Sequence, residues 1–194
     1  MEQRFKGMQH RAFDGEADAV RVIDEEKRIV ELSFSSENPV KRYGAFEILS
    51  HKAGAVKLER INTSGCLLFN HDKNAVIGKI VKAEIKNRRG IARVQFDDDD
   101  VSTMYYNKVK NGTLRNTSVG YNVYEVKRET VGKNENLKIN EVVTLWEPLE
   151  ISLVSIPADY TVGVGRGENN DDYPRGHTEL CKRKFKLNNN YNSV

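Results

Sequence analysis

Three residues whose types could together carry out serine-type hydrolysis occur along the chain in the order His71, Ser118 and Glu150. Such hydrolysis needs a hydroxyl nucleophile, an imidazole that accepts its proton, and a third group that orients the imidazole. The three residues lie in strand-like segments that read GCLLFNHD (65–72), TSVGY (117–121) and LWEPLEISLVSIPAD (145–159). These segments are apolar enough to pack rigidly. The order of the three residues and the segments around them therefore favour a hydrolytic site over a chance occurrence of the three residue types.

The chain contains four histidines, so the alternatives to His71 as the base are few. His10 and His177 lie in weakly patterned ends of the chain, where we expect that no base would be held in position. His51 follows a predicted strand and is the stronger competitor. As a purely structural residue, His71 would be a loop histidine with local hydrogen bonds.

Rival groups also exist for the other two roles. If a strand runs regularly from Asn116, Ser118 shares a polar face with Gly120, whose missing side chain would leave room for a substrate backbone. Glu150 lies against an apolar strand, where a carboxylate needs a partner, either an imidazolium or a lysine. The sequence does not decide which groups would donate hydrogen bonds to the oxyanion. The candidates are backbone amides near Gly120, Arg115 and a buried water. The rival hydroxyls and carboxylates are those of Thr117, Ser152, Glu141 and Glu147.

Length and composition predict one soluble domain with a tail. The 194 residues are enough to bury a core, and the formal net charge of +3 is too small to indicate a nucleic-acid-binding protein. Two widely separated cysteines, Cys66 and Cys181, give no support for a disulfide framework or a structural zinc site, which favours a reducing cytoplasm. No apolar run approaches the ~18 residues of a membrane span, so we expect an unsecreted chain that does not cross a membrane.

The expected organisation has three parts: a weakly patterned N-terminal segment (1–27), a folded domain (28–166), and a polar, basic tail (167–194). Apolar alternation and turn residues predict that the folded domain consists mostly of strands. A hairpin turn is expected over residues 87–90, with Gly90 as its turn-forming residue. The expected strands cover residues 28–35, 43–49, 65–69, 76–86, 90–96, 114–126, 137–146 and 149–156.

The clearest helix is expected over residues 97–111, with acidic residues at its start and Gly112 placed to cap its end. Consecutive acids such as Asp97–Asp100 point about 100° apart around a helix, so they cannot converge on one metal ion. The helix dipole explains them without a metal. We therefore expect no metal and no cofactor. The expected fold is mainly β with a few helices (α+β), forming a closed β-barrel with one prominent helix between His71 and Ser118.

The segment around His71, the helix followed by SVGY (118–121), and the run EISLV (150–154) together resemble the tailed-bacteriophage prohead maturation serine proteases, which are similar in fold to the herpesvirus capsid proteases. The resemblance covers residues 28–164 and depends on the three motifs in order, since each alone is ordinary strand sequence. It implies that His71 is the base, Ser118 the nucleophile and Glu150 the acidic partner. Two departures are expected: scaffolding would come from another chain and not from a domain after the protease, and the tail (167–194) matches nothing in the family.

The resemblance further implies an endopeptidase that acts in the host cytoplasm, inside the assembling procapsid. Its expected partners are the scaffold protein and the major capsid protein, both as substrates, with self-cleavage and a homodimer also expected. No membrane and no specific nucleic acid is expected as a partner. We also expect the basic tail (167–194) to dock the protease onto the scaffold.

Two other classes of function stay open at this point. The first is a catalytically silent, protease-like protein that serves as an assembly or scaffold-interacting protein, although such a protein would have little need to keep all three polar residues. The second is a nucleic-acid-binding β-barrel, which would draw on the basic run Lys182–Lys186. No strand shows the interleaved aromatic and basic residues that such a protein uses for stacking.

Overall fold

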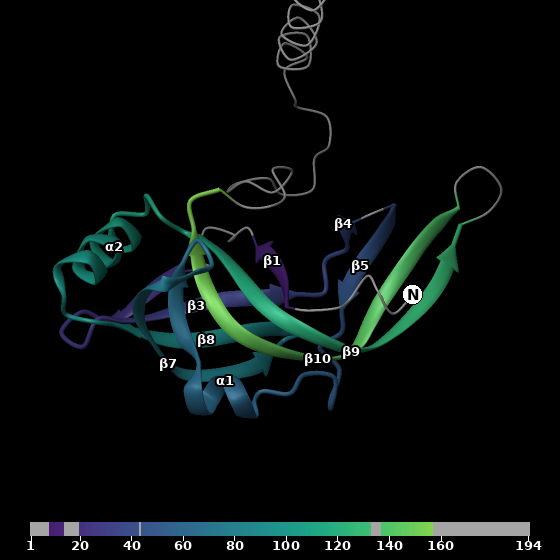
Figure 1. The fold of residues 1–194 in the computed structure, drawn as a ribbon, viewed down its shortest axis with the longest axis horizontal. Coiled ribbons are helices and arrows are strands. Elements are labelled where there is room, and N and C mark those ends of the chain that lie inside the picture. The colour runs from purple at the N-terminus through teal and green to yellow at the C-terminus, as the bar shows by residue number, and fades with distance from the viewer. Residues whose placement is uncertain (1–7, 14–19, 43, 133–136, 157–194) are drawn as a thin grey trace, which may run out of the picture.

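The computed structural model describes residues 8–13, 20–42, 44–132 and 137–156, which form a curved β-sheet with two helices (Figure 1). The expected tail (167–194), with its basic run, lies outside the described residues. The helices are α1 (Glu59–Ser64) and α2 (Asp100–Lys110). The strands are β1 (Gln9–Phe13), β2 (Val20–Asp24), β3 (Ile29–Ser36), β4 (Val40–Arg42), β5 (Ala45–Leu49), β6 (Cys66–Phe69), β7 (Asp72–Lys86), β8 (Arg89–Phe96), β9 (Asn116–Val131) and β10 (Lys138–Val154).

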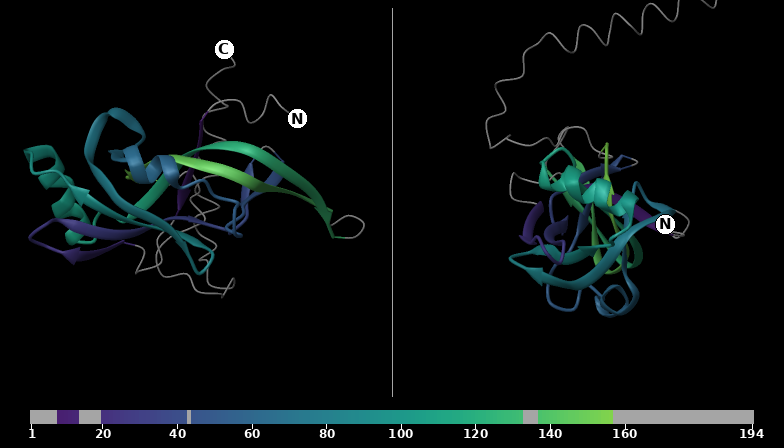
Figure 2. Two further views of the ribbon diagram at one scale, coloured as in Figure 1. Left: turned by 90° about the horizontal axis from the view of Figure 1, so that it is seen from below. Right: turned by 90° about the vertical axis from the view of Figure 1, so that its left-hand side faces the viewer.

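Strand β10 organises the sheet because it pairs with three other strands. It runs antiparallel to β9 over its whole length, and parallel to β5 near its start and to β6 near its end. Beyond β6 the order continues through β7, β8 and β3 to β2, and β1 lies on the far side of β9. Figures 1 and 2 show β9 and β10 bending together as one long ribbon whose turn end projects away from α2. The ribbon thus carries the segments that contain Ser118 and Glu150 side by side.

The mainly β class, with a prominent helix between His71 and Ser118, is confirmed, but the expected closed β-barrel is wrong. Strands β3 and β9 approach each other, and Thr117 Oγ1 donates a hydrogen bond to the Ser33 carbonyl oxygen at 2.7 Å. No ladder between β3 and β9 follows, because β9 already pairs with β1 on one edge and with β10 on the other. The two ends of the sheet are β1 and β2, and because these strands do not pair with each other, the sheet stays open within the described residues.

The helix predicted over residues 97–111 is confirmed as α2, although it begins three residues later than predicted, at Asp100. The Asp99 side chain accepts hydrogen bonds from the backbone N–H groups of Val101 and Ser102, which makes Asp99 the N-cap. Past the end of the helix, Gly112 has a φ of +70°, a conformation that favours glycine. One member of the acidic run 97–100 is therefore explained by helix capping.

The hairpin between β7 and β8 is confirmed, but its turn residues differ from the prediction. Asn87 and Arg88 carry the positive φ angles of the turn, 51° and 58°. Gly90 instead lies within β8, where a Cβ atom would fall 2.6 Å from the Phe34 ring. The glycine therefore serves close packing against β3 and not the turn.

Two predicted strands, 137–146 and 149–156, form the single strand β10. Proline has no N–H to give to a ladder and is tolerated next to a bulge. The register of β10 against β9 shifts between Pro148 and Glu150, so the strand continues through the proline and stays paired with β9.

Helix α1 was not predicted, because six residues with only Ile61 buried give no helical periodicity. Neither helix of the described ranges has the length and apolar character needed to cross a bilayer.

Candidate active site

A polar patch forms where β1, β9 and β10 lie side by side. Gly120 on β9 is the register partner of both His10 on β1 and Glu150 on β10. Two residues earlier on β9, Ser118 is the partner of Ser152 on β10. Because alternate residues of a strand point to opposite faces, these residues share one face of the sheet. The ladders thus bring together side chains from three distant parts of the chain.

His71 reaches this patch from the tight turn between β6 and β7. Asn70 and His71 have φ angles of 52° and 61°, as the two central residues of a type I′ hairpin turn require. Asn70 fastens the turn to β10, because its backbone N–H donates to the Leu153 carbonyl oxygen at 2.9 Å and its Oδ1 accepts from the Ser155 backbone N–H at 3.0 Å. The His71 backbone N–H donates to Ser152 Oγ at 3.1 Å. The turn therefore holds the imidazole against β10.

Both oxygens of the Glu150 carboxylate accept hydrogen bonds. Oε1 accepts from His71 Nδ1 at 2.7 Å, and Oε2 accepts from Ser152 Oγ at 2.7 Å. Burial alone would raise the pKa of Glu150, but its contacts with His10, His71 and Ser152 outweigh burial and lower the pKa to about 2. Glu150 is therefore ionised at neutral pH. Because a carboxylate only accepts, the neutral His71 ring carries its proton on Nδ1, and Nε2 is the nitrogen able to accept another.

Ser118 and His71 line one pocket of about 380 Å³ at this face of the sheet. Ser118 is 1% exposed, and its Oγ has no hydrogen-bond partner among the described residues. The serine is thus not committed to another group, and hydrogen bonds between catalytic groups often form only when substrate is bound. The residues that line the pocket are His10, Asn70, His71, Ser118, Val154, Ser155 and Ile156.

Gly120 has a different role from the one predicted. A Cβ atom at this position would lie 2.4 Å from Glu150 Oε1, so the space above Gly120 is filled by the carboxylate and not by a substrate backbone. A larger residue at position 120 would push Glu150 away from His71. The glycine therefore permits the hydrogen bond between the two.

His10 is a residue of the site that the sequence did not reveal. The interpretation that it lies in an end unable to hold a base is wrong, because β1 pairs with β9 and places His10 opposite Gly120. His10 Nδ1 lies 3.6 Å from Glu150 Oε1, and its ring centroid lies 4.1 Å from that of His71. The five residues of β1 show no apolar alternation, so only their pairing with β9 identifies them as a strand.

Each of the rival hydroxyls and carboxylates already has a hydrogen-bond partner, and none of them lines the pocket. Thr117 donates to the β3 backbone, and Ser152 donates to Glu150. Glu147 accepts from a tyrosine hydroxyl at 2.7 Å, and Glu141 accepts from an arginine at 2.6 Å.

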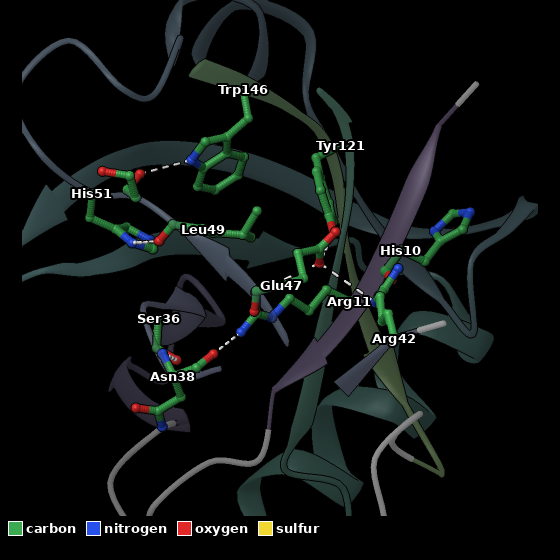
Figure 3. Close-up of polar contacts among 11 residues, drawn as sticks. His10, Arg11, Ser36, Asn38, Arg42, Glu47, Leu49, His51, Tyr121 and Trp146 are labelled. Atoms are coloured by element: carbon green, nitrogen blue, oxygen red, sulfur yellow. Dashed lines mark hydrogen bonds and ion pairs between the residues drawn. The ribbon is translucent and has the colours of Figure 1, made fainter. Parts of the chain in front are cut away.

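The rival histidine, His51, is a buried structural residue. Its Nδ1–H donates to the Leu49 carbonyl oxygen at 2.9 Å (Figure 3). Its Nε2 accepts from the Ser35 hydroxyl at 2.6 Å. Burial lowers the pKa of His51 to about 4, although the nearby Glu37 opposes this shift. The ring is therefore neutral, and both its nitrogens are occupied.

We expect His51 to make the fold sensitive to mild acid. Its pKa is near 6.5 in the unfolded chain and about 4 in the folded protein, so the unfolded chain binds the proton first as pH falls. The free energy of unfolding should therefore decrease between these two pH values by up to about 3 kcal/mol from this residue. Urea unfolding across this range should show a shallower pH dependence for His51→Gln than for the wild type. An equal slope in both would contradict the assignment, and His177→Gln is the control.

A strand serine and a turn histidine line one pocket of a mainly β domain, and a buried glutamate accepts a hydrogen bond from that histidine. These are the residue types that serine hydrolysis uses. Residues 24–169 match the caudovirus prohead serine proteases, and the chain belongs to this family. This confirms the resemblance noted from the three motifs.

Two further proteins are similar to this chain. The major capsid protein of Halomonas phage phiHAP-1 is 37% identical over 142 residues, which cover 70% of this chain. The matched region is 23% of that relative, so the chain spans less than a quarter of its length. The structure of the bacteriophage T4 capsid assembly protease, gp21, aligns with 77% of this chain and 98% of its own, at 11% identity and a TM-score of 0.48.

Proposed function

We propose that the chain is a serine endopeptidase of capsid maturation, with Ser118 as the nucleophile, His71 as the base and Glu150 as the acid that orients His71. The observation that carries this proposal is the 2.7 Å hydrogen bond between His71 Nδ1 and Glu150 Oε1 beside a pocket that Ser118 also lines. Membership of the prohead serine protease family supports peptide bonds as the target.

In this mechanism Ser118 Oγ attacks the scissile carbonyl carbon while His71 Nε2 accepts the hydroxyl proton. His71 then gives that proton to the leaving amine, and an acyl-enzyme remains on Ser118. A water molecule attacks the ester carbonyl, with His71 again accepting and returning a proton, and the second product leaves. Glu150 keeps the proton of the neutral ring on Nδ1 and stabilises the imidazolium that forms in each step.

The proposed substrates are scaffold and capsid-protein precursor segments, together with the chain itself. A relative named major capsid protein contains a region similar to this chain, which supports capsid protein as a substrate class. The proposed place of action is the assembling procapsid in the host cytoplasm. A homodimer is proposed from the resemblance to the herpesvirus proteases.

The proposal is tested by intact mass spectrometry of concentrated wild type and Ser118→Ala, each alone and with the capsid protein of the same phage. We expect the wild type to shorten itself or the capsid protein and Ser118→Ala to leave both whole. If both proteins shorten alike, a host protease is responsible and Ser118 loses its role. If neither cuts in the presence of capsid protein, the catalytically silent assembly protein becomes the better description.

Gly120→Ala should lower the cleavage rate by at least about tenfold while the domain stays folded. The added methyl group would overlap Glu150 Oε1, and the carboxylate can relieve the overlap only by leaving His71. The measurement is the cleavage rate of the wild type and the variant, with circular dichroism to verify the fold. Gly54→Ala is the control away from the site: a Cβ atom there meets nothing within 4 Å, and the strain of an alanine at its φ of +81° should lower stability but not the cleavage rate. An unchanged rate in Gly120→Ala would show that this hydrogen bond is dispensable.

A further inference from the structure

We propose that His10, His71 and Glu150 form a binding site for a divalent transition-metal ion, best matched by Zn²⁺, and that the bound ion switches the protease off. The proposal that a metal ion binds rests on the geometry alone. The inhibitory effect rests on the function proposed above.

The three side chains present their donor atoms at the spacing of a metal site. One donor atom from each residue lies within 4.8 Å of the other two. Glu150 Oε1 is 2.7 Å from His71 Nδ1 and 3.6 Å from His10 Nδ1. Ligands about 2.0–2.1 Å from a tetrahedral zinc ion lie about 3.3 Å from one another. The two measured distances lie on either side of that value, so small side-chain movements would let all three atoms reach one ion.

His10 Nδ1 lacks the partner that a metal would supply. The atom is shielded from solvent, and it has no hydrogen-bond partner among the described residues. Glu150 Oε1 is too distant for a hydrogen bond at 3.6 Å and already accepts from His71. A buried ring nitrogen without a partner is costly, and metal coordination would remove that cost.

The carboxylate is oriented by a second hydrogen bond. Ser152 Oγ donates to Glu150 Oε2, which leaves Oε1 directed toward both imidazoles. Hydrogen bonds of this kind fix ligands in metal sites. Two imidazoles and one carboxylate suit zinc and its neighbours in the periodic table better than magnesium or calcium, which prefer oxygen ligands.

A buried network anchors the strand that carries His10. Arg11, the next residue on β1, is 1% exposed and lies 3.7 Å from Glu47 Oε1. Arg42 Nε lies 3.5 Å from the same oxygen, and an Arg42 guanidinium N–H donates to the His10 carbonyl oxygen. Figure 3 shows Arg11 and His10 leaving β1 on opposite sides, Arg11 toward Glu47. The proposed ligand is therefore held by a fixed strand.

The pocket gives an ion access to two of the three ligands. His10 and His71 both line it, and His10 has 39% of its side chain exposed. Sites with three protein ligands keep a fourth position for water. In this site that water would lie toward the pocket.

A metal ion at this position would remove the base. When the ion takes Nδ1 of the neutral His71 ring, the proton on Nδ1 is released to solvent and Nε2 takes up another, so the ring keeps one proton. Nε2 then donates and cannot accept the proton of Ser118. Glu150 no longer accepts a hydrogen bond from His71 and coordinates the ion instead. Zinc is expected to inhibit without any change in the fold.

The direct test measures Zn²⁺ binding to Ser118→Ala protein, which is not expected to cut itself, by competition with a chromophoric chelator. We expect one Zn²⁺ per chain, at least about tenfold weaker binding when His10→Ala is added, and unchanged binding when His177→Ala is added. Absence of stoichiometric binding, or equal affinity with His10→Ala, would overturn the site. Because this measurement uses no activity, its result is independent of the proposed protease function.

The proposed inhibition by the bound ion is tested on active protein. Zn²⁺ should inhibit cleavage by the wild type, EDTA should restore it, and Mg²⁺ at the same concentration should have no effect. Relative to its own rate without zinc, His10→Ala should need at least about tenfold more Zn²⁺ for half inhibition. Stoichiometric binding without inhibition would overturn the switch, and an inactive wild type without zinc would count against the proposed function instead.

Discussion

Replacing His71 by alanine is expected to lower the rate of peptide cleavage by about 10⁶-fold, as much as replacing Ser118, whereas Glu150→Gln should cost about 10⁴-fold. His71 is the group that moves the proton in both halves of the proposed reaction, so nothing replaces it. Glu150 acts through His71, because its Oε1 accepts the Nδ1 proton at 2.7 Å. A glutamine at position 150 can still meet the ring, but it stabilises the imidazolium less.

The measurement is single-turnover cleavage of a capsid-protein segment at neutral pH by the wild type and each variant. The double variant His71→Ala/Ser118→Ala should be no slower than either single variant, since the two residues act as a unit. Glu147→Gln is the matched control, because Glu147 pairs with Tyr124 away from the pocket. If His71→Ala keeps its rate within tenfold of the wild type, another group is the base.

Replacing Glu47 by alanine is expected to lower the free energy of unfolding by about 3–5 kcal/mol, the largest stability effect we predict. Glu47 is 2% exposed and is the anion next to Arg11, which is also fully buried. Its Oε1 also accepts from the Tyr121 hydroxyl at 2.6 Å and lies 3.5 Å from Arg42. Removing it leaves a buried guanidinium without its counter-charge, and that penalty exceeds the value of the ion pair itself.

Urea unfolding of both proteins at neutral pH measures this effect. Glu147→Ala is the control, because it removes a half-buried carboxylate that accepts from the Tyr124 hydroxyl, and it should change stability by only about 1 kcal/mol. Glu47→Ala should also weaken the anchoring of β1, the strand that carries the proposed ligand His10. Added to Ser118→Ala protein, it should therefore weaken Zn²⁺ binding although Glu47 is not a metal ligand. A loss below 1 kcal/mol for Glu47→Ala would mean that Arg11 finds another partner or reaches water.

Much of the candidate site could be predicted because its residues lie in locally patterned segments. Ser118 and Glu150 stand in strands whose alternation is visible in the chain, and both strands exist. The capping aspartate and the closing glycine of α2 follow from the needs of any helix end. Which acid meets His71 depended on register, and the ladder between β9 and β10 places Glu150, not Glu141 or Glu147, beside the imidazole.

His10, the role of Gly120 and the openness of the sheet required the tertiary structure. β1 is a strand only because β9 offers it an edge, and its own five residues carry no periodic signal. The consequence of a missing side chain at position 120 depends on Glu150, thirty positions later in the chain. The sheet stays open because the strands at its two ends, β1 and β2, do not pair with each other within the described residues.

The sequence by itself determined which residue types could do the chemistry, the existence of α2 and the glycine that closes it, and most of the strands, since each of these depends on near neighbours in the chain. Only the tertiary structure decided which of these groups meet, since strand pairing joins residues far apart in the sequence and local periodicity carries no record of the partner. The pairing of β1 with β9 is the clearest case, because it alone brings His10 to Glu150.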